Sequence, residues 1–403
     1  MVPIEKFSVA EIARIRAMVP DVKQRLLGNL RRVCSYDRSP LLIPGAEYQG
    51  IWLEHNQDNL FLAKYAPEAA FAWIDFFISN QRADGLIMFA APLELNEFYT
   101  TPYLYWHIQC VYGFALCALQ IAELTGRGQA DFQRIYDASV KYDAWLMKYR
   151  NTSGNGLPEM FCEWDTGFDN CARVMDGGIP HSCPDYEASN CPDLEVMPIL
   201  SVDLSAMLYG HRLGLAALAE KLGRSADAAH WKSQAAELKN KMRELLYDEA
   251  DDFYYDRSPQ GLRKYRTAHI TRLFLNRVLD QAEFDRIYER YFTVPGREFL
   301  PDYPIPAVSV DDPSFDRSFP HNSWGCNTQA NTMERALLWM PYYHRDDDLD
   351  GMLSRWVKAM LRPDNRFPQE LNPFTGQPDP KSCNYTPALN IFLEAANRLE
   401  KYF

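Results

Sequence analysis

The sequence predicts an all-α fold in which consecutive pairs of helices form an α/α toroid with long loops on one face. Two observations favour this class. Apolar residues recur at i, i+3, i+4 and i+7 in segments along the whole chain, and strand-like alternation is scarce. The 403 residues are 47% hydrophobic, which is enough to bury a large core. No low-complexity linker interrupts the pattern, so we expect a single domain over residues 1–403.

Capping residues mark several ends of the expected helices. The first begins after Ser8, the third ends before Gly126, and the fifth lies between Ser201 and Gly223. The tenth ends before Pro363, as expected for a residue that cannot continue a helix. The predicted helices cover residues 9–33, 65–81, 106–125, 131–149, 203–222, 226–247, 267–277, 281–292, 328–342, 347–361 and 386–400.

Long, aromatic-rich segments connect these helices. Loops of this length inside a compact domain are usually functional. In a toroid of paired helices they would all emerge on the same face, which predicts a site there. The segments are residues 34–64, 82–105, 150–200, 293–327 and 362–385.

Charge and hydropathy argue against two classes of partner. The net charge is −12 and no cluster of Lys and Arg offsets it, so we expect no nucleic-acid partner. No run approaches the roughly 18 apolar residues that span a bilayer, so we expect no membrane partner. Residues 1–7 lack the basic and apolar regions of a signal peptide, which predicts a cytoplasmic protein.

The nine cysteines are odd in number and irregular in spacing, which suits a reducing compartment. Cys162, Cys171, Cys183 and Cys191 lie close together in sequence, beside His181. Their intervals of nine, twelve and eight residues match no common zinc pattern. We therefore expect free thiols or one local disulfide here, with no metal and no cofactor.

Two acidic stretches about 200 residues apart carry the functional signal: Asp165–Arg173 and Gln369–Gly376. In each, a carboxylate lies among turn formers and aromatic residues. Cleavage of a glycosidic bond needs a carboxylic acid that protonates the leaving oxygen and a carboxylate that holds water. Asp169 beside Phe168 suits the first role, and Glu370 suits the second. The structural alternatives are an Asx-turn or N-cap residue for Asp169 and a solvated loop carboxylate for Glu370.

The first stretch resembles the E-S-G-x-D-N-S-P-R segment of trehalase-like and family 63 glycoside hydrolases, which include mannosylglycerate and glucosylglycerate hydrolases. Residues 370–376 are similar to the E-x-Y-x-P-x-T-G motif of the same enzymes, with Glu370 at the position of its Glu. The resemblance spans roughly residues 48–400 in the same order. It implies an (α/α)6 barrel, a six-hairpin toroid, and an inverting mechanism with Asp169 as general acid and Glu370 as general base.

The sequence also departs from this family. Asp165 replaces the usual Glu, Cys171-Ala172 replaces Ser-Pro, and the segment Trp324–Asn331 lacks a Pro and a second Trp. These changes alter the expected pocket wall, so the sequence does not determine which sugar the protein binds. The resemblance implies a small α-linked glucoside or mannoside: a disaccharide, an oligosaccharide or a glycosylglycerate.

Sugar sites combine flat apolar surfaces with polar groups that bind hydroxyls. Aromatic residues in general fill protein cores, which is the alternative interpretation. His321 is expected to be a structural hydrogen-bonding residue. The predicted substrate-binding residues are Tyr48, Trp52, Asp58, Trp106, Gln109, Trp164, Asp165, Arg173, Trp324 and Asn331.

A basic set near the motifs, namely Arg173, Arg263, Lys264 and Arg266, could receive a glycerate-like carboxylate or could simply lie on a solvated loop. Two other functions are possible. A sugar epimerase or isomerase can use the same toroid but needs paired histidines at its centre, and none of the eight histidines falls in a recurrent spacing typical of an active site. A non-catalytic carbohydrate-binding protein would tolerate neutral residues at the two acidic positions, whereas this chain has carboxylates there.

Overall fold

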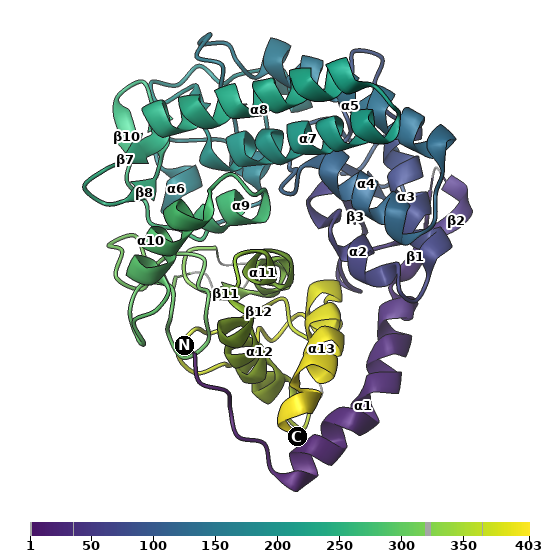
Figure 1. The fold of residues 1–403 in the computed structure, drawn as a ribbon, viewed down its shortest axis with the longest axis vertical. Helices are drawn as coiled ribbons and strands as arrows, with labels where there is room; N and C mark the ends of the chain where they lie inside the picture. Colours follow the sequence, from purple (N-terminus) through teal and green to yellow (C-terminus); the bar gives the residue numbers. More distant parts are fainter. Residues whose placement is uncertain (1, 35, 319–323, 365) are drawn as a thin grey trace.

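A closed ring of helices forms the centre of the computed structural model, which describes residues 2–34, 36–318, 324–364 and 366–403 (Figure 1). Each ring helix contacts the next, and the last contacts the first. Within the described residues the ring comprises α2 (Asp58–Leu62), α4 (Phe114–Leu124), α7 (Val202–Lys221), α9 (Ile270–Leu275), α11 (Ala330–Tyr342) and α13 (Thr386–Leu399).

A second set of helices alternates with the first along the chain and packs outside it. For example, α1 contacts α13, α8 contacts α7, and α5 lies against both α4 and α7. The two sets form the α/α toroid that the sequence predicts. The outer helices are α1 (Val9–Gly28), α3 (Pro67–Ser79), α5 (Gln129–Tyr149), α8 (Ser225–Leu246), α10 (Gln281–Tyr291) and α12 (Asp346–Met360).

The burial pattern explains why a helix lies inside or outside. Helix α7 is buried over most of its circumference, including small residues such as Gly210 and Gly214 that allow close approach of neighbouring backbone. Helix α8 buries only one stripe, with Trp231, Leu238 and Met242 among its members. Such a stripe, at spacings of three and four residues, is the expected pattern of a helix with one solvated face.

The predicted helix ends are confirmed where a cap is present and wrong where tertiary pairing intervenes. Ser8 and Glu11 form a reciprocal capping box, and the Ser201 side chain accepts a hydrogen bond from a backbone amide. The first helix ends at Gly28 rather than at residue 33, because β1 (Leu30–Val33) pairs with β2 (Tyr36–Leu42). The third helix begins at Phe114, not at residue 106.

Short antiparallel strands tie the connecting segments to one another. Strand β3 (Gly50–Trp52) pairs with β4 (Ala90–Pro92), and β11 (Thr328–Gln329) pairs with β12 (Glu370–Leu371). The remaining pairs involve β5 (Glu159–Met160), β6 (Ile199–Leu200), β9 (Asp256–Ser258) and β10 (Gly261–Arg263) in one sheet, and β7 (Tyr247–Asp248) with β8 (Phe253–Tyr254). One further short helix, α6 (Ala172–Met175), follows the first acidic motif.

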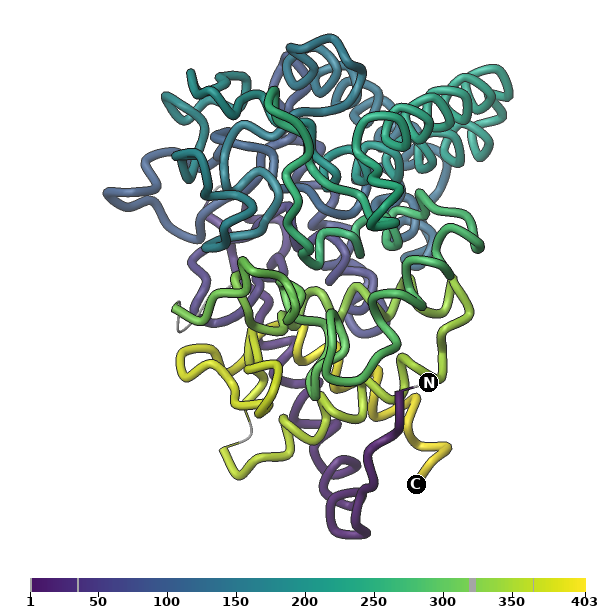
Figure 2. Tube along the Cα trace, turned by 90° about the vertical axis from the view of Figure 1, so that its left-hand side faces the viewer, coloured from purple at the N-terminus to yellow at the C-terminus, as the bar shows by residue number. Residues whose placement is uncertain are grey.

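The connecting segments gather on one side of the helices, at the left of the tube in Figure 2. The two termini lie at the same end of the molecule in both views. The N-terminal segment is held there because the Val2 amide donates a hydrogen bond of 2.6 Å to Asp348 on α12. Among the residues described, no helix has both the length and the apolar character needed to cross a membrane.

Candidate active site

A cavity of about 280 Å³ lies among the connecting segments, and each of the five segments predicted to share one face contributes to it. Its size is at the lower end for ligand pockets and therefore suits a small substrate. The predicted site residues that line it are Tyr48, Trp52, Trp106, Gln109, Trp164, Asp169, Trp324 and Asn331. The other lining residues were not among the predicted substrate-binding or catalytic residues: they are Glu54, His55, Phe89, Phe98, Tyr99, His107, Gly167, Asn170, His181, Gln369 and Tyr385.

Asp169 lies in a turn just before α6, and contacts from two directions hold this turn. The Trp324 amide donates to the Asp169 carbonyl at 3.3 Å, and the Phe168 and Trp324 rings pack with centroids 4.5 Å apart. The next amide, of Asn170, donates to the buried Glu163 carboxylate at 2.6 Å. The first acidic motif is therefore fixed against the segment around Trp324, as expected if both form one wall of a site.

Glu370 is fully buried on β12, which excludes the solvated loop carboxylate considered from the sequence. It lies opposite Gln329 in the strand pair, and the Gln329 side-chain amide donates to Glu370 Oε2 at 2.7 Å. The preceding residue, Gln369, lines the cavity and accepts a hydrogen bond of 2.7 Å from the Tyr48 hydroxyl. The strand pair thus sets the orientation of the Glu370 carboxylate behind the cavity wall.

The Tyr48 hydroxyl is influenced by carboxylates from both motifs. Burial raises the pKa of Tyr48 well above its ordinary value. Neighbouring charges raise this pKa further, and they include those of Glu54, Asp169 and Glu370. Carboxylates from the two motifs, about 200 residues apart in sequence, therefore both contribute to the electrostatic environment of one side chain in the cavity wall.

Glu54 is a buried carboxylate in the cavity wall that sequence reasoning missed. Its Oε1 accepts hydrogen bonds from Asn331 at 3.0 Å and Arg335 at 3.1 Å, and its Oε2 accepts one from Gln109 at 3.2 Å. Gly167, with φ of +71°, packs directly on this carboxylate, and a Cβ there would lie 2.6 Å from its carboxyl carbon. The only sequence signal for Glu54 is its position two residues after Trp52.

Asp165 and Arg173, predicted to bind substrate, instead lie behind the cavity in buried ion pairs. Asp165 pairs with Arg150 at 2.5 Å, and Arg173 pairs with Asp203 at 2.7 Å and Asp256 at 2.8 Å. Burial alone would raise the pKa of Asp165, but the Arg150 charge and its hydrogen bonds outweigh this effect and lower the pKa. These pairs hold the motif segment in place from behind.

The other residues of the predicted basic set also form their hydrogen bonds and ion pairs outside the cavity. Arg263 donates to two backbone carbonyls, Lys264 pairs with Asp248 at 2.7 Å, and Arg266 pairs with Glu298 at 3.2 Å. None of the three is among the residues that line the cavity. His321 lies outside the residues that the structure describes.

Asp58 is buried beside Glu334 and does not line the cavity. It accepts a hydrogen bond from Gln57 at 2.7 Å, and its Oδ2 is hydrogen bonded to His55 Nδ1 at 2.9 Å. Burial raises the pKa of Asp58 to about 7, and burial together with the Asp58 charge raises the pKa of Glu334 well above its ordinary value. The two side chains therefore share a network that favours protonated carboxyl groups at neutral pH.

This network predicts a pH-dependent stability. An unfolded Asp has a pKa of about 3.9, so the unfolded chain releases the Asp58 proton above pH 4 while the folded chain retains it up to about pH 7. Stability should fall as pH rises through this window. Glu334→Gln should make the fall in Tm between pH 5 and pH 8 shallower, whereas the exposed control Glu237→Gln should leave it unchanged. An unaltered slope in Glu334→Gln would contradict the assignment.

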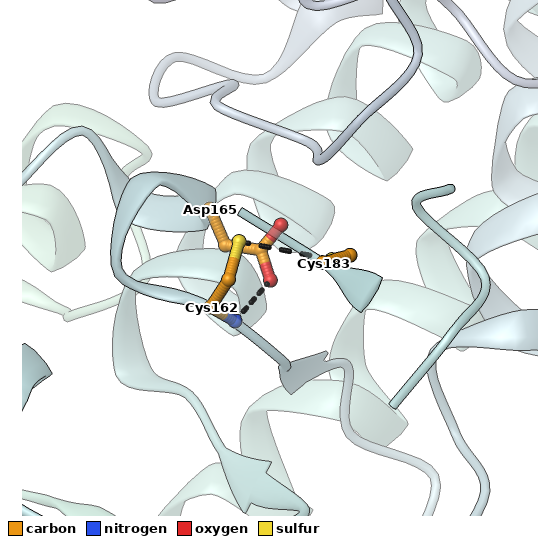
Figure 3. A group of neighbouring side chains, drawn as sticks. All are labelled: Cys162, Asp165 and Cys183. Atoms are coloured by element: carbon orange, nitrogen blue, oxygen red, sulfur yellow. Dashed lines mark hydrogen bonds between the residues drawn. The ribbon is translucent and has the colours of Figure 1, made fainter. Parts of the chain in front are cut away.

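Cys162, Asp165 and Cys183 form a compact group of possible metal ligands (Figure 3). The two sulfur atoms lie 3.7 Å apart. However, the Arg150 guanidinium contacts Cys183 Sγ at 3.4 Å and forms an ion pair with Asp165. Its positive charge therefore already balances the negative charge of this group. Burial also raises the pKa of Cys162 well above its ordinary value, which favours the thiol over the metal-binding thiolate. All nine described cysteines are free thiols.

The expected absence of a metal remains a prediction, which these contacts support. Elemental analysis of the purified protein should find no stoichiometric zinc, and a chelator should leave Tm unchanged, because Arg150 stabilises the group without a cation. Zinc in a one-to-one ratio, together with a Tm that falls on chelation, would contradict it.

The closed ring of alternating helices, with a cavity among its loops, is an (α/α)6 toroid. Residues 60–386 match the family model of the mannosylglycerate hydrolase MGH1-like glycoside hydrolase domain. Because this match covers most of the chain, the protein belongs to that family. The resemblance identified in the two acidic motifs is thereby confirmed.

Solved structures share the fold at low sequence identity. The family 63 mannosylglycerate hydrolase of Thermus thermophilus, solved with glucose, aligns with a TM-score of 0.71 at 16% identity over 94% of this chain and 100% of its own. The same enzyme has been solved with Tris and D-glycerate. Neutral trehalase of Saccharomyces cerevisiae aligns with a TM-score of 0.66 at 14% identity over 90% of this chain and 74% of its own. A search of curated proteins gave no match.

Proposed function

We propose that the protein is an inverting glycoside hydrolase that acts on a small α-linked glucoside or mannoside. Asp169 is the general acid and Glu370 the general base. The observation that carries this proposal is the meeting of the two acidic motifs at one cavity: Asp169 lines it, and Glu370 lies next to the lining residue Gln369. The names of both structural relatives, a mannosylglycerate hydrolase and a trehalase, agree with the reaction type.

The proposed mechanism uses each carboxyl group in a different protonation state. Asp169 donates its proton to the glycosidic oxygen as the bond to the anomeric carbon breaks. Glu370 stays ionised and accepts a proton from a water that attacks the opposite face of the sugar. Gln329 fixes the Glu370 carboxylate by donating to Oε2. Inversion requires a carboxyl separation of about 6.5–9.5 Å, which leaves room for this water.

The cavity wall supports a carbohydrate substrate. Trp52, Trp164 and Trp324 offer flat apolar surfaces that suit the C–H faces of a pyranose. Glu54 and Asn331 place polar groups at the buried end of the cavity, where sugar hydroxyls need partners. A non-catalytic sugar-binding protein would share these features, so only turnover separates the two functions.

The test is the configuration of the first product. A panel of α-linked disaccharides and α-glycosylglycerates is screened for hydrolysis, and proton NMR follows the anomeric signals during the first minutes. An α-glycoside should release a β-sugar first, because water attacks from the face opposite the leaving group. A first product of retained configuration would mean that a side chain of the protein acts as nucleophile.

One observation favours a second candidate function, that of a sugar epimerase. Three histidines line the cavity, His55, His107 and His181. Burial lowers the pKa of His55 and of His107 to about 4, and each is hydrogen bonded to a protein side chain. Neutral imidazoles can move protons. Conversion of free mannose or of an N-acylhexosamine, without hydrolysis of any glycoside, would favour this function.

A further inference from the structure

We infer that the cavity accepts a glycoside with an uncharged, apolar-faced aglycone and discriminates against the anionic glycerate type. This inference rests on the proposed glycoside hydrolase function and specifies its substrate class. It depends on the charge of the cavity wall, on the position of two buried arginines outside that wall and on an aromatic rim.

The charge of the wall is the first observation. Among the lining residues, all within the described part of the chain, the acidic residues are Glu54 and the proposed general acid Asp169, and Lys and Arg do not occur. Residues 319–323, of sequence FPHNS, contain neither Lys nor Arg. A carboxylate ligand in such a wall would lose hydration without gaining a cationic partner, which is strongly unfavourable.

The second observation is that two buried arginines, Arg335 and Arg272, lie outside the cavity wall. Arg335 donates to both the carboxylate and the backbone carbonyl of Glu54, at 3.1 and 3.0 Å, so its charge is matched by that residue. Arg272 is only 2% exposed and lies 5.4 Å from the centre of the Phe168 ring. Its two Nη atoms have no hydrogen-bond partner among the described residues. Neither side chain is part of the cavity wall.

An aromatic rim at the outer end is the third observation. Trp106 contacts Phe98, Tyr99 and Tyr186, with ring centroids 5.4, 6.1 and 4.6 Å apart. Phe98 is 55% exposed and Tyr186 is 58% exposed, so apolar ring surface continues from the cavity to solvent. Large exposed aromatic surfaces of this kind commonly mark binding sites.

The two ends of the cavity therefore differ in chemistry. The buried end carries Glu54 with its partners Gln109 and Asn331, which suits the hydroxyls of the glycone. The exposed end, at Phe98 and Trp106, offers ring faces that suit an apolar or aryl aglycone. A glycerate at this end would have its carboxylate beside ring surface, with neither Lys nor Arg among the described lining residues.

The test uses two ligands that differ at one carbon, which is a neutral CH2OH group in α-glucosylglycerol and a carboxylate in α-glucosylglycerate, with the corresponding α-mannosyl pair. Dissociation constants are measured with Asp169→Asn by tryptophan fluorescence at low salt, and kcat/KM is measured with the unmodified protein. The neutral member should bind at least about tenfold more tightly, and a phenyl α-glycoside more tightly still. Equal or tighter binding of the glycerate compound, or no binding of any of them, would overturn the inference.

Two variants of Phe98 test the placement of the aglycone, one that adds a positive charge at the aromatic rim and one that does not. Phe98→Arg should improve the relative affinity for the glycerate compound about tenfold, whereas the control Phe98→Gln, which removes the same ring without adding charge, should not. Equal behaviour of the two variants would overturn the placement of the aglycone. Failure of the proposed function would be seen differently: neutral glycosides would bind preferentially, yet the unmodified protein would hydrolyse none of them.

Discussion

Asp169→Asn is expected to lower kcat by roughly 10²–10⁴-fold on unactivated α-glycosides, because an amide cannot protonate the leaving oxygen. The substitution changes few atoms, and the fold of the motif depends on the Asp169 backbone carbonyl, which is retained. Steady-state kinetics on any disaccharide or glycosylglycerate that the protein hydrolyses will measure the loss. An α-glycosyl fluoride should be affected much less, because fluoride departs without protonation.

A matched control lies in the same segment. Asp176 is exposed seven residues beyond Asp169, and its Asn variant should retain near-normal kcat. Unimpaired hydrolysis of a natural glycoside by Asp169→Asn would remove Asp169 from the role of general acid. An equal loss on the fluoride and the disaccharide would point to misplaced substrate rather than to a missing proton.

Glu370→Gln is expected to abolish turnover, because no group then accepts the proton of the attacking water. No covalent glycosyl-enzyme should accumulate, since an inverting enzyme forms none. Kinetics with a glycosyl fluoride and mass spectrometry of the intact protein during turnover will measure the two outcomes. The exposed loop variant Glu97→Gln should leave both unchanged.

Because Glu370 is fully buried and hydrogen bonded to Gln329, the Tm of the variant must be measured beside its activity. A loss of activity with an unchanged Tm assigns a chemical role to the carboxylate. Retained turnover, or a mass increase equal to one glycosyl group, would show that Glu370 is not the base of an inverting reaction.

Local sequence was sufficient to predict the long helices, because their signals are local. The capping residues Ser8 and Ser201 begin helices as expected, and α8 shows the apolar stripe of an outer helix. The first predicted helix was five residues too long, since the apolar residues of 30–33 suit a strand equally well. Only pairing with β2 decides between the two states, and that partner is not part of the helical pattern.

Part of the cavity lining was also predicted from local sequence signals. Trp52, Trp164 and Trp324 were expected to line it from their places in long aromatic loops, and they do. Glu54 was missed because a single carboxylate beside a tryptophan has no distinctive pattern. Its role in the wall depends on Asn331 and Arg335, which come from the other end of the chain.

The sequence by itself determined the order of the long helices, the segments that form the loop face, and the two acidic motifs. These features depend on periodicity, capping and short motifs, which act within a few residues. Only the tertiary structure decided which charged side chains face the cavity. Asp165 and Arg173 look like site residues in the motif, yet they are neutralised by Arg150, Asp203 and Asp256 behind it. A buried charge must have a partner, and whether that partner is a ligand or a distant residue depends on contacts that the linear sequence does not contain.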